Sequence, residues 1–162
     1  MTTGDAKLWG QADGKDIFLY TLKNANGAEM NVTNYGAIVQ SLLVPVNDDL
    51  IDVVLGYDSL QEYINDPYFM GAMVGRYAGR IDGGKINING VPGKLSITGD
   101  GFHHHGGIKG FSKRVWSAEP FTVNGESGLH LDYVSEDGEE GFPGKLKVRV
   151  TYILKHNNED RK

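Results

Sequence analysis

Three consecutive histidines stand beside a Gly-Gly pair in "GFHHHGGIKGF", residues 101–111, of a chain that has five histidines in all. On a strand, His103 and His105 would point to the same face, and two imidazoles at that spacing could share a metal ion. A His-x-His metal site needs an acid shortly afterwards, but Gly107, Ile108 and Lys109 occupy that place. Because the lysine charge repels a cation, the sequence argues against a metal site, and we expect no cofactor.

The same glycines could instead belong to a polar binding site. Glycine lets the backbone approach a ligand closely, and a neutral imidazole both donates and accepts hydrogen bonds, which suits a sugar hydroxyl. A turn with surface histidines fits the same residues and is the simpler interpretation of their spacing. The residues alone leave both interpretations open.

Two arginines lie four residues apart in "GRYAGRIDGGKI", residues 75–86, each directly after a glycine. The planar guanidinium of Arg76 or Arg80 could offer its fork of donors to a ligand oxygen. A salt bridge at a strand edge is the more ordinary role of such a residue. Trp116 could stack on the face of a sugar, but we expect it to be a core residue.

Four acids lie in "SEDGEEGFPG", residues 135–144. A calcium loop would place oxygen ligands at alternating positions and end in a glutamate. This stretch ends in Phe-Pro-Gly, so we interpret it as a rigid turn leading into the last strand. Paired carboxylates could cleave a glycosidic bond, but nothing in the sequence places two of these acids across a cleft.

The elements around these residues read as strands. The 23 glycines among 162 residues exceed the usual share of about 7% and are scattered between short apolar runs, a pattern of many turns and many strands. Ser59 and Glu62 have the capping-box spacing of a short helix over residues 59–64. Alternation is cleanest over residues 145–154. The predicted strands cover residues 17–22, 30–35, 37–45, 52–57, 85–90, 94–97, 114–123, 128–134 and 145–154. We therefore predict an all-β fold, an antiparallel β-sandwich, with residues 1–162 as a single domain.

Composition excludes several classes of function. A net charge of −5 argues against a nucleic-acid partner, and the absence of cysteine excludes disulfides and thiolate sites. The first residues, "MTTGDAKLWG", are polar, and no run approaches the roughly 20 apolar residues that cross a membrane. We therefore expect no membrane segment and a cytoplasmic location.

Four segments in order resemble a known family. They are "NYGAIVQSLLVP", "DVVLGYDSLQEYINDPYFMGAMVGRYAGRI", "HGGIKGFSKRVW" and "DGEEGFPGKLKVRVTYIL". From about Ile17 onward the chain resembles the aldose 1-epimerases, also called galactose mutarotases. The resemblance implies the N-terminal part of a galactose-mutarotase-like supersandwich. It also implies that a free aldohexose is the partner, whose α and β anomers interconvert by acid–base opening and closure of the ring.

The resemblance also implies substrate-binding residues. The family's Asn-Arg pair, which contacts sugar hydroxyls, falls on Gly79 and Arg80, and the histidine of its "LHGG" motif falls on His105. Gly79 departs from the usual asparagine. Phe102 and His104 stand where the family usually has asparagine and leucine, and these changes bear on the sugar preference.

The catalytic residues of the family have no counterpart in this chain. Its acid is a histidine in "TNHxYFNL" and its base is a glutamate near the C-terminus, and both follow the segment that matches "VTYIL". Neither His130 nor His156 lies in such a motif, so we assign no catalytic residue. The chain resembles an incomplete front half, for which we expect exposed edges, self-association or a complementary C-terminal polypeptide. A non-catalytic carbohydrate-binding or interaction module derived from the family is the alternative.

Overall fold

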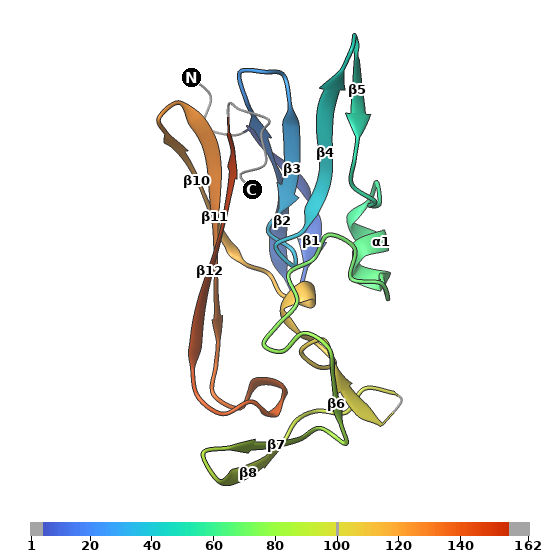
Figure 1. Cartoon of the computed structure of the whole chain (residues 1–162), viewed down its shortest axis with the longest axis vertical. Helices are drawn as coiled ribbons and strands as arrows, with labels where there is room; N and C mark the ends of the chain where they lie inside the picture. The colour runs from blue at the N-terminus through green and yellow to red at the C-terminus, as the bar shows by residue number, and fades with distance from the viewer. Residues whose placement is uncertain (1–4, 100, 156–162) are drawn as a thin grey trace.

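Two antiparallel sheets form most of the molecule (Figure 1). The computed structural model describes residues 5–99 and 101–155. In the first sheet, consecutive strands are neighbours: β1 (Asp5–Ala12), β2 (Lys15–Lys23), β3 (Glu29–Thr33), β4 (Val39–Val46) and β5 (Asp49–Asp52). The second sheet contains β10 (Ser117–Val123), β11 (Glu126–Ser135) and β12 (Leu146–Leu154) in that order.

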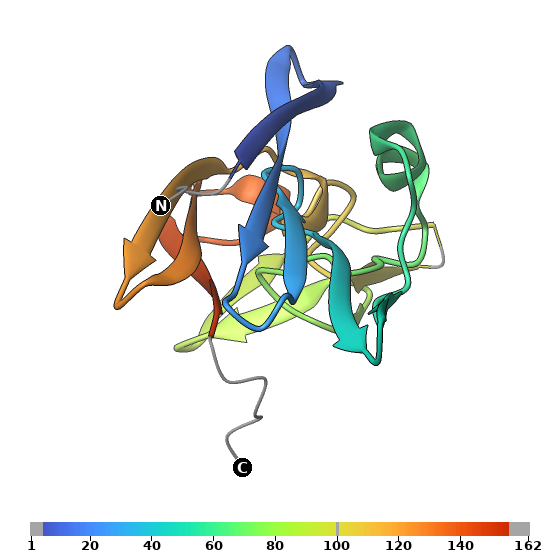
Figure 2. The same cartoon turned by 90° about the horizontal axis from the view of Figure 1, so that it is seen from above.

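The core lies between these two sheets, which stand face to face in both views (Figures 1 and 2). Leu22 of β2 and Val32 of β3 pack in one cluster with Leu131 of β11. On β12 the alternation is as predicted, because Val148, Val150, Tyr152 and Leu154 pack against this cluster while the residues between them are exposed. The antiparallel β-sandwich is therefore confirmed. Trp116 is only 2% exposed within the same cluster and is a core residue, as expected.

The one α-helix in the described residues, α1 (Leu60–Asn65), begins where the sequence predicts it. The Ser59 hydroxyl accepts the Glu62 amide while the Glu62 carboxylate accepts the Ser59 amide, which is the predicted capping box. At the other end, the Lys113 ammonium donates to the carbonyl oxygens of Tyr63, Ile64 and Asp66 at 2.7, 3.0 and 2.8 Å. The helix is thus fixed to the loop that precedes β10.

Shorter elements lie below the sandwich in Figure 1. Strand β6 (Arg80–Asp82) pairs with β9 (Phe102–His104), and β7 (Lys85–Ile88) forms a hairpin with β8 (Val91–Lys94). Two 3-10 turns, η1 (Phe111–Lys113) and η2 (Glu139–Gly141), connect this region to the second sheet. The candidate site residues all belong to this part of the chain.

The predicted strand over residues 52–57 is wrong. Regular pairing ends at Asp52, whose carboxylate accepts the backbone N–H groups of Leu42 and Val54, both at 3.0 Å. The chain then leaves the sheet, and Val53 and Leu55 are 57% and 82% exposed. An aspartate side chain that binds nearby backbone competes with the strand ladder and ends it.

The strand predicted over residues 94–97 is also displaced. Residues 91–94 form the strand instead, and they pair with residues 85–88. Asn89 and Gly90 both have positive φ, so they close a two-residue hairpin turn and the returning strand begins at once. Ile88, the last residue of β7, is 46% exposed.

Some apolar surface remains exposed. Large apolar side chains are exposed near the β4–β5 turn, at Val46, Leu50 and Ile51. A hollow of about 320 Å³ lies at the β7–β8 hairpin, lined by Ile86, Ile88, Val91, Pro92, Gly93, Gly141 and Pro143. Among residues 5–99 and 101–155, no helix combines the length and apolar character needed to cross a membrane.

Candidate functional site

Two loop segments, residues 75–80 and 105–111, lie against each other along their backbones. The Gly75 carbonyl accepts the Phe111 amide at 3.2 Å, and the Gly79 carbonyl accepts the His105 amide at 2.9 Å. The Gly79 amide in turn donates to Nδ1 of His105 at 3.0 Å. The structure therefore brings Gly79, Arg80 and His105 together, and we call this region the Arg80–His105 corner.

The Gly-Gly pair of the opening segment makes this close approach possible. Gly106 and Gly107 have φ values of 92° and 107°, a region that side chains disfavour. A Cβ on Gly106 would overlap the carbonyl oxygen of Gly75, and one on Gly107 would overlap the Glu140 carboxylate. Both glycines are therefore required by the packing around the histidine.

The hydrogen bond from Gly79 fixes the tautomer of His105. A backbone N–H can only donate, so Nδ1 of His105 must be the unprotonated nitrogen and Nε2 carries the hydrogen. The ring is half-buried, with its centroid 4.9 Å from that of Phe69. His105 therefore presents one N–H donor and keeps its other nitrogen engaged.

The other histidines have different roles. His103 is fully buried, with Nδ1 2.9 Å from the Ser96 carbonyl oxygen and its ring against Phe142. His130, on β11, stacks on Phe121 and has Nδ1 2.9 Å from the Thr151 hydroxyl. His156 lies outside the described residues. Within residues 5–99 and 101–155, no three His, Cys, Asp or Glu side chains gather closely enough to hold a metal ion.

Arg80 begins β6 and extends over an aromatic ring. Its guanidinium carbon lies 5.1 Å from the centroid of Phe102, across the β6–β9 pair, and the side chain is exposed. No hydrogen bond or ion pair to another described residue occupies this guanidinium. Its planar fork of donors is therefore available to a ligand, while the ring contact limits where it can point.

Arg76 is a structural residue. Its Nε donates to the Ser135 hydroxyl at 2.9 Å, and its terminal nitrogens donate to carbonyl oxygens at 2.8 to 3.2 Å. Those carbonyl groups belong to Ser135, Glu136, Pro143 and Gly144. Instead of the predicted salt bridge, we find a clamp that fixes the loop at residues 75–80 to the turn between β11 and β12.

Phe69 is a member of this corner that sequence reasoning missed. Its ring packs against His104 and His105, with centroids 5.6 and 4.9 Å apart. The Asp66 carboxylate orders the preceding turn by accepting the amides of Tyr68 and Met70 at 2.7 and 2.9 Å. The Asp-Pro pair in the sequence signals such a turn, but it does not reveal which ring the turn delivers.

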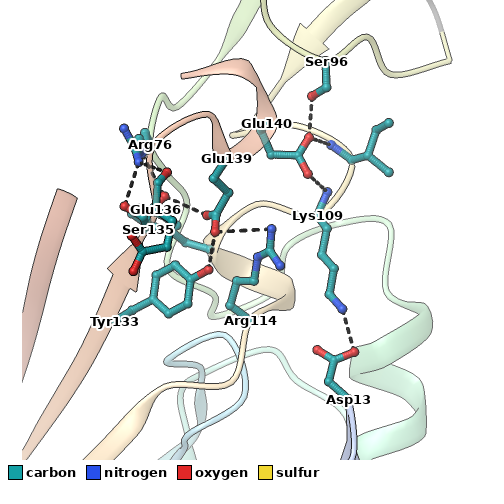
Figure 3. A network of polar contacts seen from close by, with 12 residues as sticks. Asp13, Arg76, Ser96, Lys109, Arg114, Tyr133, Ser135, Glu136, Glu139 and Glu140 are labelled. Atoms are coloured by element: carbon teal, nitrogen blue, oxygen red, sulfur yellow. Dashed lines mark hydrogen bonds and ion pairs between the residues drawn. The ribbon is translucent and has the colours of Figure 1, made fainter. Parts of the chain in front are cut away.

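The acid-rich turn predicted to be rigid is held by two carboxylates that face different parts of the molecule (Figure 3). Glu139 accepts the Tyr133 hydroxyl at 2.5 Å and the Ser135 hydroxyl at 2.8 Å, and it lies 3.5 Å from the Arg114 guanidinium. Burial and the neighbouring Glu139 raise the pKa of Tyr133. The phenol therefore stays protonated and donates to the carboxylate.

Glu140 reaches the loop that carries His105. It accepts the backbone amides of Ile108 and Lys109 at 2.9 and 3.0 Å, and the Ser96 hydroxyl as well. Partial burial, taken alone, would raise the pKa of Glu140. The hydrogen bonds from Ser96, Lys109 and Ile108, together with the Arg114 charge, outweigh that effect and hold this pKa below its usual value.

A second hollow, of about 390 Å³, lies beside the same loop. Its lining includes Ile108 and Lys109 but not Arg80 or His105. The Lys109 ammonium there pairs with Asp13 at 2.6 Å, and Lys113 is engaged by the carbonyl groups at the end of α1. Both cations of this hollow therefore have protein partners.

The fold resembles solved sugar epimerases. Against a galactose 1-epimerase from Lactobacillus acidophilus NCFM the TM-score is 0.86 at 29% identity, covering 96% of this chain and 45% of the other. A GalM/aldose epimerase homologue from C. elegans gives a TM-score of 0.74 at 27% identity, covering 84% of this chain and 41% of the other. The sandwich is thus of the type found in galactose epimerases.

The sequence comparisons define the family. Residues 19–161 match the aldose 1-epimerase family. The Haemophilus influenzae aldose 1-epimerase is 40% identical over 146 residues, which are 90% of this chain and 42% of that protein. The Sus scrofa galactose mutarotase is 44% identical over 103 residues, 64% of this chain and 29% of that protein. The chain belongs to the aldose 1-epimerase family, and it spans less than half the length of these relatives.

Proposed function

We propose that this chain supplies the sugar-binding front half of an aldose 1-epimerase that acts on the anomeric carbon of a free hexose such as galactose or glucose. One observation carries the proposal: the Gly79 amide fixes an N–H donor on His105, and the next residue, Arg80, has a guanidinium that no described residue engages in a hydrogen bond or ion pair. Hydrogen-bond donors of this kind suit the hydroxyl and ring oxygens of a sugar. The rings of Phe69 and Phe102 provide the apolar surface that small-ligand sites combine with a few polar groups.

Anomer exchange needs more than these donors. A base must take the proton of the anomeric hydroxyl while an acid protonates the ring oxygen, and the opened ring then closes on the other face. Nδ1 of His105 is engaged by Gly79 and Nε2 carries a hydrogen, so His105 binds a sugar oxygen but has no free lone pair to act as base. His103 and His130 are engaged elsewhere. We therefore propose that residues 1–162 form an incomplete domain and that a complementary C-terminal polypeptide supplies the acid histidine and the base glutamate.

Polarimetry of freshly dissolved α-D-galactose tests the catalytic part. With this chain alone, we expect the rate of rotation change to equal that of the buffer blank. Addition of the C-terminal half of a relative should raise the rate, and His105→Ala should remove that gain. A rate above blank with the chain alone, lost in His105→Ala, would show that these 162 residues already contain the proton-transfer pair.

Calorimetric titration with galactose tests the binding part. We expect the wild-type chain to bind, and both Arg80→Ala and His105→Ala to weaken binding by about tenfold or more, since each removes a polar partner of a sugar oxygen. No binding by the wild type would contradict the proposed site.

The engaged Nδ1 of His105 also favours a second candidate, a carbohydrate-binding or interaction module without catalysis. Such a module would bind galactose but would gain no activity when a C-terminal half is added. Light scattering distinguishes the two further. A stable monodisperse monomer fits the module, whereas self-association through the open sheet edges fits the incomplete enzyme.

A further inference from the structure

The loop that carries His105 is held by a carboxylate from a distant part of the chain. Glu140 lies 32 and 31 residues after Ile108 and Lys109, whose amides it accepts. Figure 3 shows its carboxylate reaching the Lys109 amide and the Ser96 hydroxyl, while the Glu139 carboxylate points toward Ser135 and Tyr133. The contact therefore joins the β11–β12 turn to residues 105–110.

The geometry resembles an anion site built from consecutive backbone amides. Two successive N–H groups converge on one carboxylate, an arrangement that fixes the dihedral angles of the residues between them. Gly107 has no side chain, and a Cβ there would overlap the Glu140 carboxylate. Glu140 can therefore occupy this position only because residue 107 is a glycine.

His105 needs such support because its own backbone is strained. Its φ is 46°, a left-handed conformation that costs about 1–2 kcal/mol for a residue with a side chain. On the side of residues 75–80, two hydrogen bonds with Gly79 hold it in place. On the other side, the loop that follows is fixed where Glu140 accepts the Ile108 and Lys109 amides.

We propose that Glu140 is a positioning residue for sugar binding: its carboxylate holds residues 106–109 so that His105 keeps its Nε2–H donor in a fixed orientation within the Arg80–His105 corner. The role in binding rests on the proposed function, in which His105 and Arg80 contact the sugar. The conformational part concerns the free protein and stands on the loop contacts alone.

Glu139 provides a matched control. It is the neighbouring residue on the same turn, and its partners are Tyr133, Ser135 and Arg114, none of which belongs to residues 105–110. Glu139→Gln and Glu140→Gln remove the same charge from the same turn. Only Glu140→Gln replaces one of the two carboxylate oxygens that accept the Ile108 and Lys109 amides.

The first experiment uses ¹⁵N NMR of the whole chain without sugar. In Glu140→Gln we expect the amide signals of Ile108 and Lys109 to move and the two ring nitrogens of His105 to lose their fixed Nε2–H signature. In Glu139→Gln these signals should stay in place. If Glu140→Gln does not fold, Ser96→Ala provides a milder variant, which should move the same signals less and in the same direction. Unchanged His105 ring signals in the folded variant would overturn the inference.

The second experiment titrates the same proteins with galactose. We expect Glu140→Gln to bind about tenfold more weakly than the wild type and Glu139→Gln to stay within about twofold, compared at equal folded fractions. Wild-type affinity in Glu140→Gln would overturn the positioning role. If the wild type binds no galactose, the proposed function fails, and the sugar-free spectra still decide whether Glu140 fixes His105.

Discussion

Arg76 and Arg80 lie four residues apart, each directly after a glycine, yet the structure uses them in opposite ways. Arg76 donates five hydrogen bonds to the end of β11 and the turn that follows it. Arg80 lies over the ring of Phe102 with its donors unoccupied by the described residues. What differs is the element that each side chain faces, so the role of an arginine in a glycine-rich loop is decided by strands from elsewhere in the chain.

The largest effect should come from Gly106, where an added Cβ would overlap the backbone of the loop that carries both arginines. Gly106→Ala should lower the free energy of unfolding by about 4 kcal/mol, since a strained φ is combined with overlap on the Gly75 carbonyl. Gly90→Ala is the control, because its φ of 85° is similar but no atom lies within 4 Å of the added Cβ. Urea denaturation measures both. Equal losses would mean that close approach of the two loops does not matter.

Arg76→Ala and Arg80→Ala should have different effects on stability, because only Arg76 is a structural residue. We expect Arg76→Ala to lower the free energy of unfolding by about 2–3 kcal/mol, because the Ser135 hydroxyl and four carbonyl oxygens lose a charged hydrogen-bond donor. Arg80→Ala should stay within about 0.5 kcal/mol of wild type, because the side chain is exposed and makes no hydrogen bond or ion pair with residues 5–99 and 101–155. Thermal denaturation of the pair checks this, and a larger loss for Arg80→Ala would break the contrast between the two arginines.

Phe102→Leu should sharpen the role of Arg80. A cation–π contact at an exposed site is worth about 0.5–1 kcal/mol, so galactose affinity should fall by about two- to fivefold as the guanidinium becomes less confined. Calorimetry measures this change. The same substitution in an Arg80→Ala background should have no further effect on affinity; a further fall would show that the ring acts on the sugar directly.

The smallest effect should be acid sensitivity of the loop. The native contacts hold the pKa of Glu140 below its ordinary value of 4.5, so the stability it contributes is fully present above pH 4.5 and is lost as the pH falls through the native pKa. The free-energy difference between wild type and Glu140→Gln should therefore shrink below pH 4.5. A difference that stays constant down to pH 3 would contradict this assignment.

Local patterns explain which parts of the fold could be predicted. The alternation in β12 and the capping box of α1 depend on residues a few positions apart, and both are found as expected. A strand over residues 52–57 would need pairing with another part of the chain. The Asp52 side chain ends that pairing by binding the Leu42 and Val54 amides. The apolar residues of this segment give no sign of that competition.

The candidate site likewise contains residues that the sequence predicts and residues that it does not. The motifs pointed to Gly79, Arg80 and His105, and the structure places these residues together, while their role in sugar binding stays a prediction. Phe69 and Glu140 could not be predicted, because each meets the histidine loop across more than 30 residues of sequence. A short motif can name the residues that contact a ligand, but it leaves out the residues that hold them in place.

The Arg76 clamp also has a consequence for the order in which the chain can fold during synthesis. The first sheet joins neighbouring strands, so it can assemble as soon as β5 has left the ribosome. The carbonyl groups that Arg76 needs lie 59 to 68 residues after it. A nascent chain that stops before residue 136 therefore has all strands of the first sheet, but it lacks the Glu136, Pro143 and Gly144 carbonyl groups that hold Arg76. The Arg76 clamp is complete only once Gly144 has emerged, directly before the last strand of the second sheet.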